Sequence, residues 1–130
     1  MNITVLCFDF QGSGLSQGKY ISLGVFERDD VALIIEYLRS SEKVTCIGLW
    51  GRSMGACTAL LHGDRDPSIA GMILDSPFAS LKVLAKELAT QRAGNVPSFV
   101  LSGILSFVRK TIKKKAFFDI NDLVPINHVQ

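Results

Sequence analysis

The chain has 130 residues, of which 48% are hydrophobic, and its formal net charge is +2 at pH 7. This is the size of one ordinary domain that can bury a substantial core, and the charge is too small to indicate a nucleic-acid partner. The most apolar window, residues 99–108, is too short to span a bilayer, and no basic region precedes the apolar run at the N-terminus, so we expect a cytoplasmic protein without a signal peptide.

The first predicted element is a strand at residues 3–10, ITVLCFDF. This continuous run of β-branched and aromatic residues suits a strand that is buried on both faces of a parallel sheet. The loop after it contains Gly12, Gly14 and Gly18, a spacing similar to that of a dinucleotide-binding turn. The third glycine falls one position late, however, and the next helix starts too far along the chain to meet a pyrophosphate. We therefore expect no nucleotide and no other cofactor.

Helical and strand patterns then alternate along the chain. Residues 24–40 predict an amphipathic helix with an acidic first turn, and residues 44–50 predict a strand. A second helix is predicted from residue 54 to residue 62, and a further strand at residues 69–74. This order predicts an α/β fold in which three parallel strands are joined by right-handed crossover helices.

The last third of the chain has a different pattern. Residues 79–92 and 98–115 each predict a helix, with the break between them at residues 93–97, AGNVP. The second helix begins apolar and ends in a basic run at residues 109–115. Basic side chains at this position complement the helix dipole, and contact with a membrane surface or an acidic partner is the alternative. The tail that follows, residues 119–128, is predicted to be a loop.

The three cysteines, Cys7, Cys46 and Cys57, lie in apolar surroundings. Because their number is odd and their neighbours are hydrophobic, we interpret them as reduced core residues, which favours a reducing compartment. Neither the cysteines nor the histidines have the spacing of metal ligands. No metal site is therefore expected.

The pentapeptide GRSMG at residues 51–55 has the G-x-S-x-G spacing of a nucleophile elbow. The strand predicted before it and the helix predicted after it are the context that this motif requires. Ser53 is the candidate nucleophile, because a sharp strand-to-helix turn lifts its hydroxyl clear of the sheet. Gly51 and Gly55 are expected to remove side chains that would collide at the turn. The Met54 N–H is expected to stabilise a developing oxyanion.

Three separated motifs in this order resemble the α/β-hydrolase superfamily: FDFQGSGLS at residues 8–16, GLWGRSMGA at residues 48–56 and LDSPF at residues 74–78. The likeness is closest to the branch that holds serine aminopeptidase-like and prolyl-oligopeptidase-like hydrolases. It implies a partial α/β-hydrolase fold in a single domain. The expected parts of this domain (1–130) are the sheet core with the elbow (1–78), a helical cap or lid (79–118) and a tail (119–130).

The superfamily places an acid and then a histidine after the nucleophile in chain order, and the resemblance extends only to Ser53 and the Met54 N–H. Asp75 is an alternative acid, although a residue at this strand end also serves to close the loop. His62 ends the elbow helix, where it also serves as a cap, and His128 lies in the tail, so neither is a good candidate for the base. We expect the catalytic acid and histidine to lie outside this chain.

The sequence therefore predicts the central portion of a serine hydrolase that acts on a small-molecule or peptide ester, thioester or amide through an acyl-enzyme on Ser53. The alternative is a catalytically inactive or truncated interaction module that keeps the elbow because its fold was inherited. In the resembled fold another strand lies between those predicted at residues 3–10 and 44–50. We expect the chain alone to expose apolar sheet edges and to self-associate.

Overall fold

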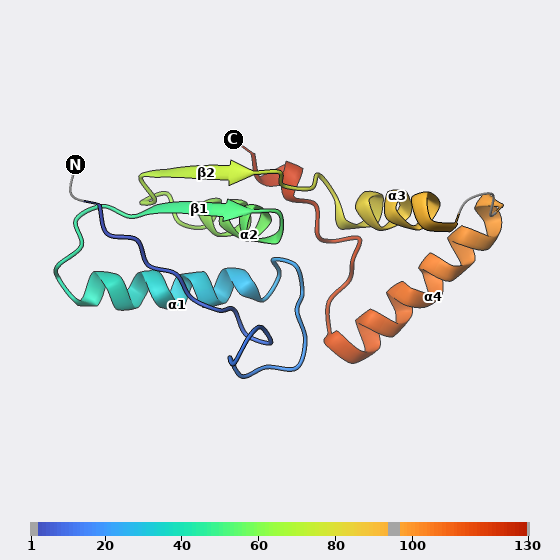
Figure 1. Cartoon of the computed structure of the whole chain (residues 1–130), viewed down its shortest axis with the longest axis horizontal. Helices are drawn as coiled ribbons and strands as arrows, with labels where there is room; N and C mark the ends of the chain where they lie inside the picture. The colour runs from blue at the N-terminus through green and yellow to red at the C-terminus, as the bar shows by residue number, and fades with distance from the viewer. Residues whose placement is uncertain (1–2, 94–96, 130) are drawn as a thin grey trace.

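The computed structural model describes residues 3–93 and 97–129, in which a strand-containing body is followed by two long helices (Figure 1). The predicted break between these helices includes residues 94–96, which lie outside the described residues. The described elements, in chain order, are α1 (Glu27–Ser40), β1 (Gly48–Arg52), α2 (Met54–Gly63), β2 (Gly71–Asp75), α3 (Leu81–Ala93), α4 (Ser98–Ala116) and the 3-10 helix η1 (Pro125–His128).

The sheet consists of β1 and β2, which pair in parallel. Gly48 lies opposite Gly71 at one end of the pair, and Arg52 lies opposite Asp75 at the other. The crossover between the strands is α2, which packs against both of them (Figure 1). Because the strands are parallel, their carboxyl ends meet at the same edge of the sheet, where ligands of open α/β folds usually bind.

The prediction of a strand at residues 3–10 is wrong in this structure. The segment has neither helical nor strand structure, and no strand in the described part of the chain pairs with it. Its side chains are largely exposed, and Ile3 and Val5 are each 75% exposed. A β-branched run becomes a strand only where a neighbouring backbone completes its hydrogen bonds, and no such neighbour lies beside this run among the described residues. The expected three strands are therefore two.

The helix α2 lies at the centre of the body, in contact with β1, β2, α1 and η1. Residues 56–62 of α2 are all buried. A helix that is buried on every side needs apolar and small side chains all round, and the sequence MGACTALLHG supplies them. Its smallest buried side chains are Ala56, Cys57 and Ala59, which are at most 4% exposed.

The helix α1 begins at Glu27 and not at Gly24, because the Glu27 carboxylate organises the loop before it. This buried carboxylate accepts hydrogen bonds from the backbone N–H groups of Ser22 and Gly24, each at 2.7 Å, and from the Ser22 hydroxyl. Both carboxylate oxygens therefore have hydrogen-bond donors inside the protein, as a buried polar group requires. The helix then buries Val31 and Ile35.

The tail folds back onto the body, although the sequence predicts only a loop there. Leu61 of α2, Leu81 of α3, and Ile120 and Leu123 of the tail form one buried cluster. The tail also contains η1, which packs against α2. This cluster is the apolar attachment between the body and the start of the helical pair.

A buried carboxylate fastens the other end of the helical pair. Asp119 accepts hydrogen bonds from Nε and Nη2 of Arg109 at 2.7 and 2.6 Å, from Nζ of Lys113 at 3.3 Å and from the backbone N–H of Asn121 at 3.0 Å. The Arg109 guanidinium, with these other donors, holds the pKa of Asp119 well below its usual range. The C-terminal end of α4 is thereby anchored to the tail.

One face of the sheet is exposed. Trp50 and Ile73 lie opposite each other on β1 and β2 and are 78% and 60% exposed. The expected exposed apolar sheet surface is therefore present, whereas self-association stays a prediction.

The cysteines occupy two different environments, and all three are free thiols. Cys57 is buried in α2 as expected, and its burial raises the pKa of the thiol. The prediction is wrong for Cys7 and Cys46, which are exposed. Both belong to segments that were expected to be buried strands, and neither segment forms strand structure at these positions.

Candidate active site

Ser53 occupies the single-residue turn between β1 and α2, with φ +51° and ψ −112°. This combination lies outside the regions that ordinary L-residues adopt, so it persists only where the surroundings over-determine it. The Ser53 N–H donates to the Asp75 carbonyl oxygen at 2.8 Å, and the Ser53 carbonyl oxygen accepts from the Cys57 N–H at 3.1 Å. The end of β2 and the first turn of α2 thus hold the serine backbone from both sides.

The Ser53 side chain is exposed and, among the described residues, makes no capping hydrogen bond to α2. The hydroxyl oxygen of a serine at the start of a helix usually accepts a hydrogen bond from an N–H group of the first turn, because these groups have no partner within the helix. Here the hydroxyl is not used in this way, and the first turn contains no acidic residue. The positive end of the α2 dipole and the Met54 N–H are therefore beside the serine, where they suit a developing negative charge.

The two motif glycines differ in their surroundings. A Cβ on Gly51 would lie 2.2 Å from the carbonyl carbon of Gly55 and 2.5 Å from the backbone nitrogen of Ala56. Every other residue type at position 51 would therefore collide with the backbone of α2. A Cβ on Gly55 would meet no described atom within 4 Å. The predicted crowding is thus present at Gly51 and wrong at Gly55, because that side of the first turn faces no described element.

Asp75, the alternative acid, lies at the carboxyl end of β2 beside the elbow. Its carboxylate accepts a hydrogen bond from the Ser76 hydroxyl at 2.7 Å and lies 3.4 Å from Nε of Arg52. Ser76 itself has a φ of +53°, so the chain turns sharply at this point. These contacts match the loop-closing role, and they engage both carboxylate oxygens with groups other than a histidine.

Both histidines of the chain lie at the opposite end of α2 from Ser53. His62 is in the last turn, with Nε2 3.5 Å from Oδ2 of Asp66. His128 places Nδ1 2.7 Å from Oδ2 of Asp64, the residue that follows α2. Since α2 has 10 residues, these side chains and the serine are separated by roughly 15 Å of helix. The structure does not bring a histidine of this chain to the elbow.

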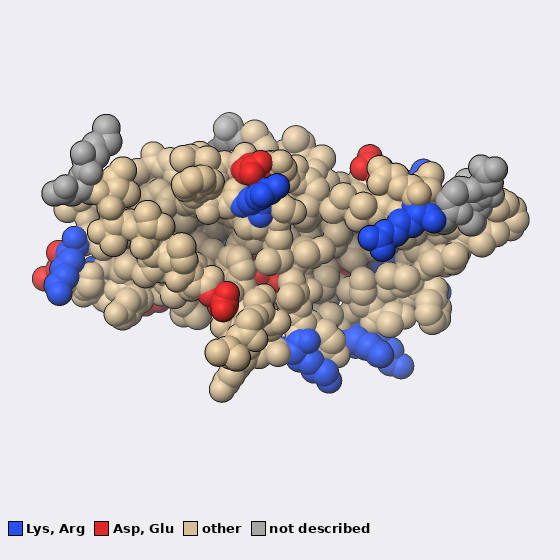
Figure 2. Space-filling view, viewed as in Figure 1, with Lys and Arg blue, Asp and Glu red and all other residues tan. Residues whose placement is uncertain are grey.

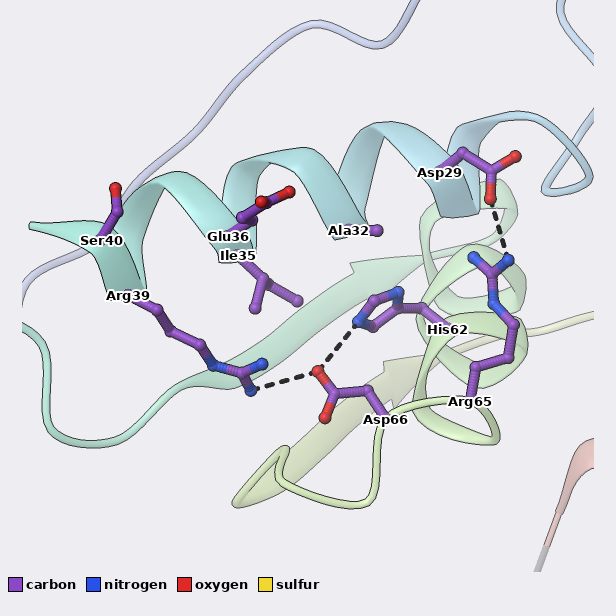
Figure 3. A pocket seen from close by; sticks show the side chains of 9 residues that line it. All are labelled: Asp29, Ala32, Ile35, Glu36, Arg39, Ser40, His62, Arg65 and Asp66. Atoms are coloured by element: carbon purple, nitrogen blue, oxygen red, sulfur yellow. Dashed lines mark hydrogen bonds and ion pairs between the residues drawn. The ribbon is translucent and has the colours of Figure 1, made fainter.

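A cleft of about 640 Å³ lies beside His62, away from Ser53 (Figure 3). It runs between α1 and the C-terminal end of α2, where Nη1 of Arg65 pairs with Oδ1 of Asp29 at 2.9 Å. Within the described residues, no group of His, Cys, Asp and Glu side chains is arranged to hold a metal ion, at this cleft or elsewhere. The cleft is lined by Asp29, Ala32, Ile35, Glu36, Arg39, Ser40, His62, Arg65 and Asp66.

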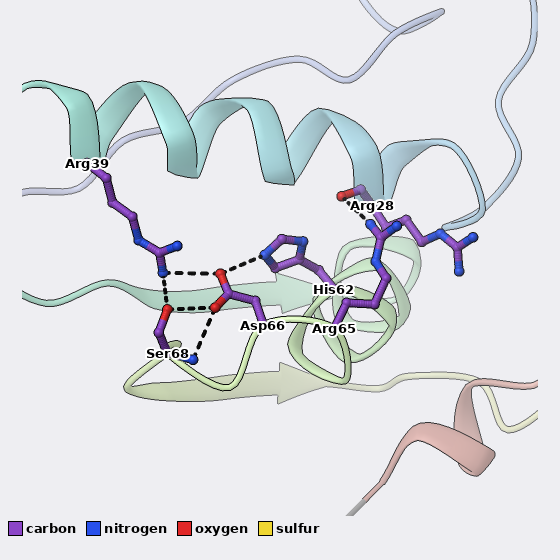
Figure 4. Close-up of polar contacts among 6 residues, drawn as sticks. All are labelled: Arg28, Arg39, His62, Arg65, Asp66 and Ser68. Atoms are coloured by element: carbon purple, nitrogen blue, oxygen red, sulfur yellow. Dashed lines mark hydrogen bonds and ion pairs between the residues drawn. The ribbon is translucent and has the colours of Figure 1, made fainter.

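Asp66, which also lines this cleft, is the centre of a polar network (Figure 4). Its Oδ1 accepts from the hydroxyl and the N–H of Ser68 at 2.6 and 3.1 Å, and its Oδ2 lies 3.1 Å from Nη2 of Arg39. Hydrogen bonds from Ser68, together with the Arg39 charge, lower the pKa of Asp66 to about 2. Because Arg39 belongs to α1 and Asp66 follows α2, we interpret the network as a polar tie between the two helices.

The strand, the strained serine and the following buried helix define the class of this protein. Residues 1–118 match the family model described as serine aminopeptidase, S33, so the chain belongs to this family of α/β-hydrolases. The mixed α/β structure with its two-stranded parallel sheet is consistent with part of that fold.

A relative in Bacillus subtilis (strain 168), described as uncharacterized protein YqkD, is 36% identical over 110 residues. The match covers 82% of this chain and 35% of the relative, so the chain spans about one third of the relative's length.

Proposed function

We propose that Ser53 is the nucleophile of a serine hydrolase to which this chain contributes the elbow. The observation that carries the proposal is an exposed serine held at φ +51° between a strand and a buried helix, with its hydroxyl not used as a cap. Such a backbone costs on the order of 1–3 kcal/mol, and sites of this kind cluster where function needs them. Membership of a hydrolase family supports the same conclusion.

In the proposed reaction the Ser53 oxygen attacks the carbonyl carbon of an ester, thioester or amide, and the hydroxyl proton passes to a base. The oxyanion of the tetrahedral intermediate accepts a hydrogen bond from the Met54 N–H at the positive end of α2. The intermediate collapses, the leaving group departs with a proton, and an acyl-enzyme remains on Ser53. Water then hydrolyses this ester and restores the serine.

The base and the acid of this reaction are proposed to come from outside these 130 residues. Both histidines lie at the far end of α2, and the Asp75 carboxylate is engaged by Arg52 and Ser76. A serine hydroxyl without a base is a poor nucleophile near neutral pH. The isolated chain is therefore expected to turn over esters slowly or not at all.

Covalent labelling with a fluorophosphonate probe tests this function in the isolated chain and in a longer polypeptide that contains it. We expect the longer form to be labelled, the isolated chain to be labelled weakly or not at all, and Ser53→Ala to abolish labelling in both. Ser76→Ala removes the neighbouring exposed serine and should leave the labelling unchanged. Undiminished turnover of an activated ester by the Ser53→Ala variant would overturn the assignment.

The second candidate function is an interaction module without catalysis. The observation that favours it is the absence of a histidine of this chain near Ser53. The same labelling experiment separates the two candidates, because a folded longer form that resists the probe supports the interaction module. Robust esterase activity of the isolated chain that disappears in His128→Ala would instead identify the tail histidine as the base.

A further inference from the structure

The helix α4 presents large apolar side chains to solvent along its N-terminal half. Phe99, Ile104 and Phe107 are 76%, 53% and 72% exposed. Val100 and Val108 extend this surface, and the positions 100, 104, 107 and 108 follow the helical repeat that places residues on one face. We call these five residues the apolar half of the α4 face.

The opposite side of α4 already has its partner. Leu101 is buried, and α4 contacts α3, with the two helices closest at the C-terminal end of α3 and the N-terminal end of α4 and diverging from there (Figure 1). The exposed residues are therefore not left over from an unpacked helix, since α4 has a buried side and a separate solvent face. Among the described elements, none covers that solvent face.

The same face becomes basic toward the C-terminal end of the helix. Lys110, Lys114 and Lys115 are exposed, and no carboxylate within the described ranges forms an ion pair with them. The neighbouring Arg109 and Lys113 are instead held by Asp119 and turn toward the tail. Figure 2 shows Lys and Arg side chains projecting beside the C-terminal end of α4. We call the three free lysines the basic half of the face.

We propose that the α4 face binds an anionic lipid surface. The helix lies in the plane of the interface, with the aromatic and aliphatic side chains inserted at the acyl boundary and the lysines against acidic headgroups. Within the described ranges, none of the helices has the length and hydropathy of a membrane span. The Asp119 anchor fixes the orientation of this face relative to the body.

Charge favours a lipid surface over a second copy of the chain. If two copies paired through this face in antiparallel order, the lysines of each would be pressed against the phenylalanines of the other. In parallel order the two sets of lysines would meet and repel. The antiparallel arrangement would remove the lysine charges from water without a partner, and the parallel arrangement would place like charges against each other. Both are unfavourable for a symmetric dimer. An anionic membrane offers acyl chains to the apolar half of the face and acidic headgroups to the basic half at the same time.

Vesicle flotation of the intact chain tests this proposal, with phosphatidylcholine vesicles that either contain or lack phosphatidylserine. We expect binding to the vesicles that contain phosphatidylserine and weaker binding as salt is raised, because the headgroup attraction is screened. Replacing the three free lysines by Gln should weaken binding by about a hundredfold. The matched control changes the net charge equally at exposed sites outside α4: Lys19→Gln, Lys43→Gln and Lys86→Gln.

A second variant tests the apolar half. Phe99→Ser combined with Phe107→Ser should lower vesicle binding by at least about tenfold, because insertion of two phenyl rings is lost. Circular dichroism checks that the helix content is unchanged. The proposal is wrong if the wild type binds neither vesicle, or if the α4 lysine variant binds as well as its control. A dimer in light scattering that needs Phe107, without vesicle binding, would identify a second copy as the occupant.

Discussion

The helices α2 and α4 both contain many apolar residues, but α2 buries them and α4 exposes several of them to solvent. Residues 56–62 of α2 are buried on all sides, whereas Phe99 and Phe107 of α4 are more than 70% exposed. The difference lies in their neighbours: α2 has two strands, α1 and η1 around it, whereas among the described residues α4 contacts α3 and, near its C-terminal end, the Leu61 cluster and Asp119. The proposed nucleophile would need the rigid support that α2 receives, and a helix with an exposed face can serve as a contact surface.

The largest effect is expected from the elbow glycine. In Gly51→Ala the new Cβ would lie 2.2 Å from the backbone of Gly55, so we expect a loss of on the order of 4 kcal/mol in the free energy of unfolding, or failure to fold. The control is Gly55→Ala, because a Cβ at this position meets open space. This variant should have a free energy of unfolding up to about 1 kcal/mol higher than the wild type. Urea denaturation measures both. Equal stability of the two variants would contradict the observed turn.

The second prediction compares apolar truncations in the core and on α4. Leu123 is 1% exposed in the buried cluster, so Leu123→Ala should lower the free energy of unfolding by about 3 kcal/mol. Phe107→Ala removes a larger side chain from the solvent face and should change it by less than about 0.5 kcal/mol. Urea denaturation measures both variants. A large loss from Phe107→Ala would show that the α4 face is covered within the molecule.

The smallest of these effects should come from the anchor of α4, because Arg109 and Lys113 are partly exposed to water. The pKa of Asp119 lies well below its usual range when the protein is folded. Its ionised form therefore stabilises the fold above the unfolded pKa of about 4, and this contribution is lost as the pH falls below that value. We expect Asp119→Asn to be less stable than the wild type at pH 7.

The pH dependence supplies the control for this prediction. The difference in urea midpoint between the wild type and Asp119→Asn should shrink as the pH is lowered from 5 toward 2, in steps chosen around the ordinary aspartate pKa. Asp29→Asn removes the exposed partner of Arg65 and should show little of this change. A difference for Asp119→Asn that is independent of pH would contradict the role assigned to its charge.

The sequence predicts the local parts of the fold well. The turn at Ser53, the helix after it and both helices of the C-terminal pair are found where patterns of neighbouring residues place them, whereas the strand before the turn begins at Gly48, four residues later than predicted. The strand predicted at residues 3–10 fails because strand formation depends on a partner backbone, which no local pattern reports. The prediction of crowding at Gly51 is confirmed, because the backbone that a Cβ would meet belongs to Gly55, only four residues along the chain.

The polar contacts between residues far apart in the chain could not be predicted from the sequence. The sequence around Asp119 predicts a loop. It does not indicate that the side chains of Arg109 and Lys113 bind the Asp119 carboxylate. The bond from the Ser53 N–H to the Asp75 carbonyl oxygen joins two motifs that the sequence shows separately. The bond from Ser53 to Asp75 depends on the register of β1 and β2, which local patterns do not report.

The complete burial of α2 also determines how the molecule can open. A fluctuation that exposes the whole of α2 must separate it from both strands, α1 and η1 together, so we expect it to amount to global unfolding. The α3 and α4 pair is attached to that centre through the Leu61 cluster and the Asp119 anchor, so its separation exposes Leu61 but leaves the contacts of α2 with the strands, α1 and η1 in place. We therefore expect the α3 and α4 pair to open more readily than the centre of the body, to which the serine belongs.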